Sequence, residues 1–173
     1  MLGLDAPTGN RREFMPRVPR GARGGAPSTQ PESRRTGGWT PIAVLLIDDR
    51  SLFGESLAAA INALAPDVAV SHRRSAAALV DLSAALRCAD VVLVNIGRAD
   101  PAKGGISQLL SALSGGTAHP PVAVLADRPG PAVTDVAARL GLRGVLSGRM
   151  PLAEVVAALR VIHNGGTVTP DPG

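Results

Sequence analysis

The fold is decided by the stretch IAVLLIDD, residues 42–49. Its first six residues are all nonpolar, which is typical of a parallel strand that is buried on both faces. Two adjacent acids, Asp48 and Asp49, follow at the carboxyl end of that strand, where open α/β sheets bind their ligands. Because neighbouring carboxylates repel each other, the pair is typical of a site that binds a cation.

Strand and helix patterns alternate from Ile42 onward. We expect strands at residues 42–47, 67–71, 91–94, 122–125 and 144–147. A helix should follow each strand. The first three carry nonpolar stripes at Leu52, Phe53, Leu57, Ile61 and Leu64, at Leu79, Leu82 and Leu86 with Ser75 as cap, and at Ile106, Leu109, Leu110 and Leu113. The fourth should run from about Ala132 and end at Gly141, and the fifth should begin at Pro151 and carry Leu152, Val155, Val156, Leu159 and Ile162. Five such units predict an α/β fold with a doubly wound parallel sheet.

The composition is that of one domain with an aliphatic core. The chain has 173 residues, of which 45% are hydrophobic and only 2% aromatic. It contains neither a nonpolar run of the roughly 18 residues that a membrane span needs nor the nonpolar stretch of a secretory signal. Its single cysteine, Cys88, excludes an intrachain disulfide or a multi-cysteine zinc site, and we expect it to be a small buried residue. These features predict a soluble cytoplasmic protein.

The excess positive charge is confined to the first 41 residues. Residues 1–41 contain seven arginines and three acids, whereas the rest of the chain has eleven basic and eleven acidic residues. The segment also holds six prolines and seven glycines, which predicts a disordered arm. Such an arm can contact nucleic acid or an anionic surface. The alternatives are an extension without a role and a start codon assigned too far upstream.

The sequence lacks the motifs of the common α/β enzymes. Neither a G-x-G-x-x-G loop after the first strand, nor a G-x-x-x-x-G-K-[ST] loop, nor a G-x-S-x-G turn is present. The three histidines, His72, His119 and His163, do not have metal-ligand spacing and are expected on the surface or in loops. We therefore do not expect an enzyme.

Four segments resemble the receiver domain of response regulators. IAVLLIDDRSLFGESLAAAI is similar to the opening of a receiver, and CADVVLVNIG and PPVAVLADR resemble its third and fourth strands. ARLGLRGVLSGRMPLAEVVAALRVIHNGG is similar to the end of receivers that precede a LuxR-type helix-turn-helix. The resemblance covers residues 42–170 and implies a flavodoxin-like receiver fold with strand order 2-1-3-4-5.

The resemblance also assigns the functional positions. In receivers an acid pair holds Mg²⁺ and an aspartate accepts a phosphoryl group, aided by a Ser/Thr, a Lys and a switching aromatic. Asp48 and Asp49 match the acid pair, whereas the other positions carry Asn95 for the acceptor, Ala126 for the Ser/Thr, Val145 for the aromatic and Gly148 for the Lys. An amide is not the anionic nucleophile that an acyl phosphate requires.

With one carboxylate fewer, the site should bind Mg²⁺ weakly and need no other cofactor. Alternatively, Asp48 and Asp49 only cap the helix that follows them. Lys103, the only lysine, lies in the loop after the third strand and could swing toward the site.

These positions favour a degenerate receiver that acts as a phosphorylation-independent protein-interaction module. The alternative is a truncated regulatory half of a LuxR-type transcription regulator that lacks its DNA-binding domain, since the chain ends about where such proteins begin their linker. A third hypothesis is an active receiver that uses Asp100 or Asp127 as acceptor.

The last helix offers a contact surface. Ala153, Ala157 and Arg160 form a stripe that flanks Val161, opposite the nonpolar stripe. We expect a protein partner or a second copy to dock there, unless the stripe is an ordinary solvated face. We expect neither a membrane nor DNA as a partner, apart from weak contacts of the arm with DNA.

Overall fold

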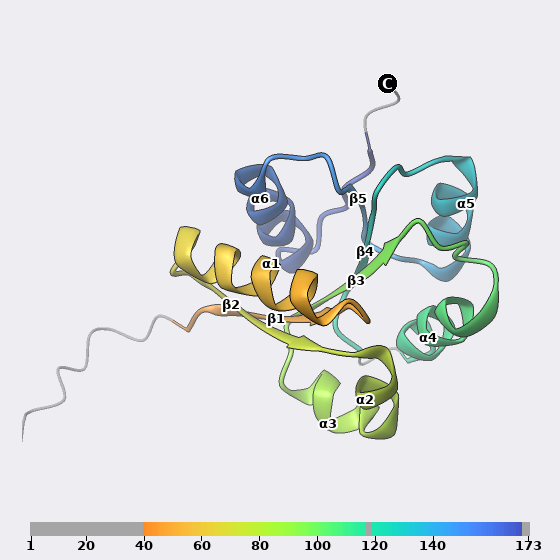
Figure 1. Ribbon diagram of the computed structural model, residues 1–173, viewed down its shortest axis with the longest axis horizontal. Helices are drawn as coiled ribbons and strands as arrows, with labels where there is room; N and C mark the ends of the chain where they lie inside the picture. The colour runs from red at the N-terminus through yellow and green to blue at the C-terminus, as the bar shows by residue number, and fades with distance from the viewer. Residues whose placement is uncertain (1–39, 117–118, 171–173) are drawn as a thin grey trace, which may run out of the picture. The chain divides into compact units, whose positions relative to one another are not determined.

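The nonpolar runs form one parallel sheet in the computed structural model, which describes residues 40–116 and 119–170 (Figure 1). Its strands are β1 (Ile42–Ile47), β2 (Val68–Arg73), β3 (Val91–Gly97), β4 (Val122–Ala126) and β5 (Gly144–Ser147). The strand order is β2-β1-β3-β4-β5, and every pair is parallel. The expected α/β fold and strand order are therefore confirmed.

Helices cover both faces of the sheet (Figure 1). They are α1 (Ser51–Leu64), α2 (Ser75–Val80), α3 (Leu82–Arg87), α4 (Gly104–Ser114), α5 (Pro131–Leu140) and α6 (Leu152–His163). Alternate residues of β1 point into two separate cores. Leu45 and Ile47 pack against α2 to α5, whereas Val44 and Leu46 pack against α1 and α6. The inner strands β1, β3 and β4 are thus buried on both faces, which accounts for their largely nonpolar sequences. The edge strand β2 alternates instead, with Val68 and Val70 buried and Ala69 and Ser71 exposed.

The nonpolar stripe predicted for α1 is wrong in part. Leu52, Phe53 and Leu64 are 82%, 43% and 51% exposed, and the buried face consists of Gly54, Ala58 and Ile61. These residues follow one another at helical spacing, and two of them are small. The helix therefore packs closely on the sheet at Gly54 and Ala58, and Ile61 and the partly buried Leu57 are the large side chains that reach the core.

The segment after β2 also differs from the prediction. Instead of one helix, two short helices meet at Asp81, whose side chain accepts a hydrogen bond from the backbone N–H of Ala84 (3.3 Å) and caps α3. Leu79 is exposed. Cys88 follows α3 and is exposed, so the expectation that it is buried is wrong. Pro151 precedes α6 instead of beginning it.

An irregularity ends β3 next to the acid pair. Asn95 pairs with Leu125 and Gly97 with Ala126, so Ile96 is an extra residue in β3. Gly97 adopts a left-handed backbone conformation with φ of 55°, which glycine tolerates best. Bulges of this kind change the direction in which nearby side chains point.

Residues 1–39 of the predicted arm (residues 1–41) lie outside the described residues. No helix within residues 40–116 and 119–170 has the length and nonpolar character required to cross a membrane.

Candidate functional site

The site lies at the carboxyl ends of β1 and β3, two neighbouring strands whose chain connections leave in opposite directions. Asp48 follows β1 directly, and Asn95 lies near the end of β3. Both polar side chains are buried, with 2% and 7% of their surface exposed. Ligands of open α/β sheets bind at such a point, where the order of the strands reverses.

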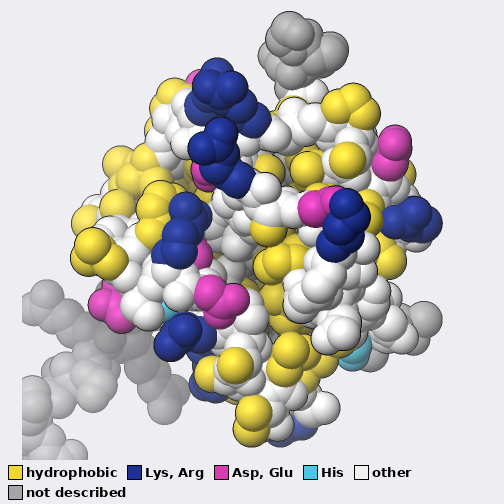
Figure 2. All heavy atoms as spheres, turned by 45° about the vertical axis from the view of Figure 1, so that its right-hand side comes forward, with side chains coloured by type: hydrophobic (Ala, Val, Ile, Leu, Met, Phe, Trp, Pro, Cys, Tyr) yellow, Lys and Arg dark blue, Asp and Glu magenta, His cyan; other side chains and the backbone are white. Residues whose placement is uncertain are grey.

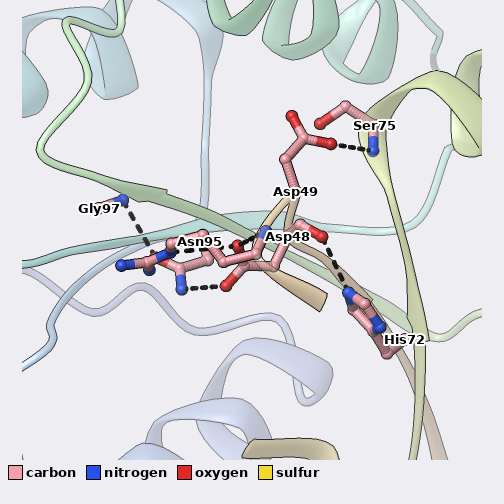
Figure 3. A network of polar contacts seen from close by, with 7 residues as sticks. Asp48, Asp49, His72, Ser75, Asn95 and Gly97 are labelled. Carbon is pink, nitrogen blue, oxygen red and sulfur yellow. Dashed lines mark hydrogen bonds and ion pairs between the residues drawn. The ribbon is translucent and has the colours of Figure 1, made fainter. Parts of the chain in front are cut away.

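Asp48 accepts hydrogen bonds on both carboxylate oxygens. Its Oδ2 accepts from Asn95 Nδ2 at 2.5 Å (Figure 3). Its Oδ1 accepts from the backbone N–H of Arg50 at 2.8 Å and from Arg50 Nε at 3.4 Å. A buried carboxylate is costly unless it is hydrogen-bonded and paired with a positive charge, and these donors meet both conditions.

The orientation of the Asn95 amide is set by the bulge. Asn95 Oδ1 accepts from the backbone N–H of Gly97 at 3.0 Å, so its NH₂ group is the one that faces Asp48. The extra residue in β3 brings that N–H group within reach. The amide thus joins the carboxylate at the end of β1 directly to the backbone at the end of β3.

Arg50 supplies the positive charge at this edge. Its guanidinium lies 4.5 Å from the centroid of the Phe53 ring, a favourable cation–π distance. A Cβ atom on Gly97 would lie 3.5 Å from the same guanidinium, so Arg50 reaches across from the end of β1 to the end of β3. The chain's own cation therefore occupies the neighbourhood of Asp48.

Asp49 points away from Asp48 (Figure 3). Its Oδ1 accepts from the backbone N–H of Ser75, the first residue of α2, at 2.9 Å. The carboxylate thereby satisfies one of the free N–H groups that begin every helix. Asp49 thus caps a helix, although it is α2 and not the helix that follows the acid pair.

His72 supports the site from β2, so its expected place on the surface or in a loop is wrong. The ring is half-buried, and Nε2 lies 2.8 Å from the backbone carbonyl oxygen of Asp48. Because a carbonyl only accepts, Nε2 carries the proton and donates. His119 and His163 are exposed, as expected.

These side chains do not fit a magnesium ion. The lone pairs of Asp48 are directed at N–H donors, and Asp49 is directed at Ser75. Mg²⁺ requires oxygen ligands in a nearly octahedral arrangement. Within the part of the chain that the structure describes, no group of three or more His, Cys, Asp or Glu side chains could hold a metal.

The remaining positions bring no reactive group to Asn95. Ala126 is the buried last residue of β4, Val145 is buried in β5, and Gly148 follows β5. Lys103 Nζ lies 3.2 Å from Asp100, whose carboxylate also accepts from the Ala102 backbone. The hydrogen bond from the Ala102 backbone N–H, followed by that from Lys103, holds the pKa of Asp100 below its usual value.

The sequence interpretation missed Arg50, His72 and Gly97. Arg50 carried a usable signal, because a cationic side chain directly follows the acid pair at the start of a helix. The contacts of His72 and Gly97 depend on strand pairing and on the bulge, and neither has a local pattern.

No protein-family model matches the sequence, and no curated protein matches it either. Solved structures do match. The chain is similar to a LuxR family DNA-binding response regulator from Silicibacter pomeroyi, with 17% identity and a TM-score of 0.62 over 76% of this chain and 98% of that one. It is also similar to the isolated REC domain of RcsB from Salmonella enterica serovar Typhimurium, determined in the presence of the phosphomimetic BeF₃⁻. The sequence identity is 17% and the TM-score is 0.62, over 76% of this chain and 95% of that one. The signal receiver domain of the response regulator NarL from Mycobacterium tuberculosis is 24% identical, with a TM-score of 0.58 over 73% of this chain and 98% of that one. The expected receiver fold is thus confirmed.

Proposed function

We propose that this chain is a pseudo-receiver of two-component signalling, which acts as a protein-interaction module without being phosphorylated. The proposal rests on the hydrogen bond from Asn95 to Asp48. In an active receiver the corresponding groups would be carboxylates that leave room for a cation and a phosphoryl group. Here an amide and a carboxylate satisfy each other.

The chemistry of the site supports this proposal. The lone pair of an amide nitrogen is delocalised into the adjacent carbonyl group, so the nitrogen is a poor nucleophile toward phosphorus, and the amide oxygen is uncharged. Ala126 offers no hydroxyl group and Gly148 no ammonium group to stabilise phosphoryl oxygens. The site therefore performs no catalysis on its own.

The same contacts favour a single conformation. A ligand shifts a conformational equilibrium only when it binds the two states differently. At this site the carboxylate of Asp48 is already paired with Arg50 and hydrogen-bonded to Asn95. A phosphoryl group would therefore find no unpaired charge through which it could favour a second conformation. We therefore infer a constitutive cytoplasmic interaction module.

Phosphodonor labelling tests this proposal. We expect no retarded band on a phosphate-affinity gel after incubation with acetyl phosphate and Mg²⁺, and no binding of BeF₃⁻. A band that disappears in Asp100→Asn or Asp127→Asn, but not in the control Asp135→Asn on α5, would show an alternative acceptor and contradict the proposal.

The partner surface is proposed to be the outer face of α6. Ala153, Ala157 and Val161 are exposed there. Arg160, which the sequence placed on the same surface, is instead held by Asp67 through two hydrogen bonds of 2.7 Å. The small residues allow another helix to approach closely, because the interaxial distance depends on the side chains at the contact.

We expect Ala157→Glu to abolish association with a partner or a second copy while the fold is retained. The matched control is Ala138→Glu on the exposed face of α5. Sedimentation equilibrium and pull-down from the native host report association, and circular dichroism reports the fold. A strictly monomeric chain whose partner binding survives Ala157→Glu would disprove the assignment.

A second candidate is the regulatory half of a LuxR-type transcription regulator. The similarity to a LuxR family DNA-binding response regulator favours it. A helix-turn-helix reading frame directly downstream of the gene would support this candidate over a free-standing module.

A further inference from the structure

Three arginines follow the carboxyl ends of three adjacent strands. Arg98 follows β3, and Arg128 and Arg149 lie two residues beyond β4 and β5. All three line one pocket of about 300 Å³, together with Asp127 and Gly148. The topology therefore brings three arginines from separate loops to one pocket.

The positive charge in this pocket is not neutralised. Within the described residues, ion pairs join Arg50 to Asp48, Lys103 to Asp100 and Arg160 to Asp67, so none of the three pocket arginines lies within 4.0 Å of a carboxylate. Asp127 is the one acid that lines the pocket, which leaves a net charge of two positive units. Like charges at close range repel each other, and a bound anion removes that cost.

Gly148 keeps the pocket open. A Cβ atom at this position would lie 3.3 Å from Asp127 Cα and 3.7 Å from Asp127 Oδ1. Any longer side chain would therefore extend along the wall that Asp127 forms. Gly148, which stands at the lysine position of receivers, thus also leaves space between the arginines.

A second pocket of about 390 Å³ adjoins the first and shares Arg98, Asp127 and Arg128 with it. The rest of its lining is mostly nonpolar: Gly97, Ala99, Pro101, Ala126, Gly130, Ala132 and Val133. Its other acid, Asp100, is paired with Lys103. On the face of the molecule that Figure 2 displays, Lys and Arg side chains lie scattered among nonpolar ones. A ligand that fills both pockets would carry a nonpolar part and a negatively charged part.

We propose that these two pockets bind a small organic phosphate without covalent reaction. The phosphate group contacts Arg98, Arg128 and Arg149, and the nonpolar part lies against Pro101, Ala132 and Val133. Arginine matches phosphate because its planar group donates two parallel hydrogen bonds to two oxygens. A pocket of this size suits a small molecule and not a peptide or nucleic acid chain. This inference does not depend on whether Asn95 can be phosphorylated.

The test uses phenyl phosphate as the probe, with inorganic phosphate and phenol as the two halves of the same ligand. The full chain is titrated in a buffer free of phosphate and followed by NMR. We expect saturable binding of phenyl phosphate that is at least tenfold tighter than that of inorganic phosphate, no saturation by phenol, and shifts at Gly97 and Gly148.

Two variants and a control separate this site from general charge attraction. Arg98→Gln combined with Arg149→Gln should weaken binding at least tenfold. Arg143 is exposed and directly precedes β5, at the end of that strand opposite to the pocket, so Arg143→Gln should leave binding unchanged. Asp127→Asn removes the one competing acid and keeps all three arginines, so it should tighten binding several-fold.

The tighter phosphate binding expected for Asp127→Asn tests the proposal even if the double variant fails to fold. Absence of saturable binding, equal losses in Arg143→Gln and the double variant, or unchanged affinity in Asp127→Asn would each overturn the proposal.

Discussion

Asn95 and an aspartate differ by one NH₂ group in place of one oxygen, and that group determines what Asp48 can do. At 2.5 Å from Asp48 Oδ2, an amide nitrogen donates a hydrogen bond. A carboxylate oxygen at the same distance would face a second negative charge in a buried site. Such a pair requires a proton or a cation between its members.

We expect Asn95→Asp to destabilise the fold by about 2–4 kcal/mol without metal, because one partner of a buried pair becomes a like charge. Mg²⁺ should restore part of that loss and bind more tightly than to the wild type, whose affinity we place at millimolar or weaker, about −4 kcal/mol. Thermal melts with and without Mg²⁺, together with calorimetric titration, measure both effects.

The control for this prediction is Asn95→Leu, which removes the donor without adding a ligand. It should also melt at a lower temperature, but Mg²⁺ should not rescue it. Micromolar Mg²⁺ binding by the wild type would contradict the prediction.

The sequence placed Asp48 and Asn95 correctly at strand ends, because uninterrupted nonpolar runs define those ends. It could not tell that Asp49 points away from Asp48. That contact joins residues 26 positions apart and depends on where the loop after β2 places Ser75. The same limit applies to Arg50, whose type was visible but whose position over Phe53 depends on the path of the chain before α1.

At the scale of the elements, α1 shows how small residues can replace a stripe of large ones. Gly54 lies directly against the His72 ring: a Cβ atom there would come within 2.3 Å of Nε2. The ring cannot move away freely, since it donates to the Asp48 carbonyl. The glycine therefore allows α1 to pack beside β2.

We expect Gly54→Ala to destabilise the protein by about 1–3 kcal/mol through overpacking, as measured by urea unfolding. Gly105→Ala in the first turn of α4 is the control, because a Cβ atom there meets nothing within 4 Å. Combining Gly54→Ala with His72→Ala should recover part of the lost stability. A neutral Gly54→Ala would mean that α1 is not held against β2 as described.

Two of the helix predictions that used periodicity, for α1 and for the segment after β2, failed in part, whereas those for α4 and α6 placed Leu109 and Leu159 correctly in the core. Leu79 was assigned to the core by its spacing to Leu82 and Leu86, yet it is exposed because the chain breaks at Asp81. The side chain of Asp81 caps a new helix there, although the nonpolar spacing of the sequence continues across the break. By contrast, the end of α5 at Gly141 was predicted correctly, since a glycine with φ of 66° can end a helix there.

At the scale of the whole domain, one ion pair joins parts that are far apart in sequence. Arg160 of α6 donates through Nε and Nη2 to both oxygens of Asp67, the residue just before β2. The pair connects the last helix to the turn after α1, on the face of the sheet that both helices cover. The doubly wound sheet was predictable from the alternating pattern and its strand order from the resemblance to receiver domains, whereas this contact between residues 93 positions apart was not.

The Asp67–Arg160 pair should make part of the stability depend on pH. The hydrogen bonds from Arg160 hold the pKa of Asp67 below its usual value, and they raise that of Arg160 in turn. A carboxyl group with a lowered pKa in the folded state binds fewer protons there than in the unfolded chain. Its contribution is therefore fully present above the usual aspartate pKa of about 3.9, and it is lost as the pH falls through the folded-state value.

The difference between wild type and Asp67→Asn isolates this contribution, because the other acids titrate in both proteins. We expect the wild type to be the more stable at neutral pH, and we expect the difference in urea midpoint to shrink below about pH 4. Arg160→Gln should show the same loss of pH dependence, and the double variant should add nothing further, because the two residues act as a pair. If the difference between wild type and Asp67→Asn stayed constant down to the acid limit, the pair would not be what joins α6 to the turn before β2.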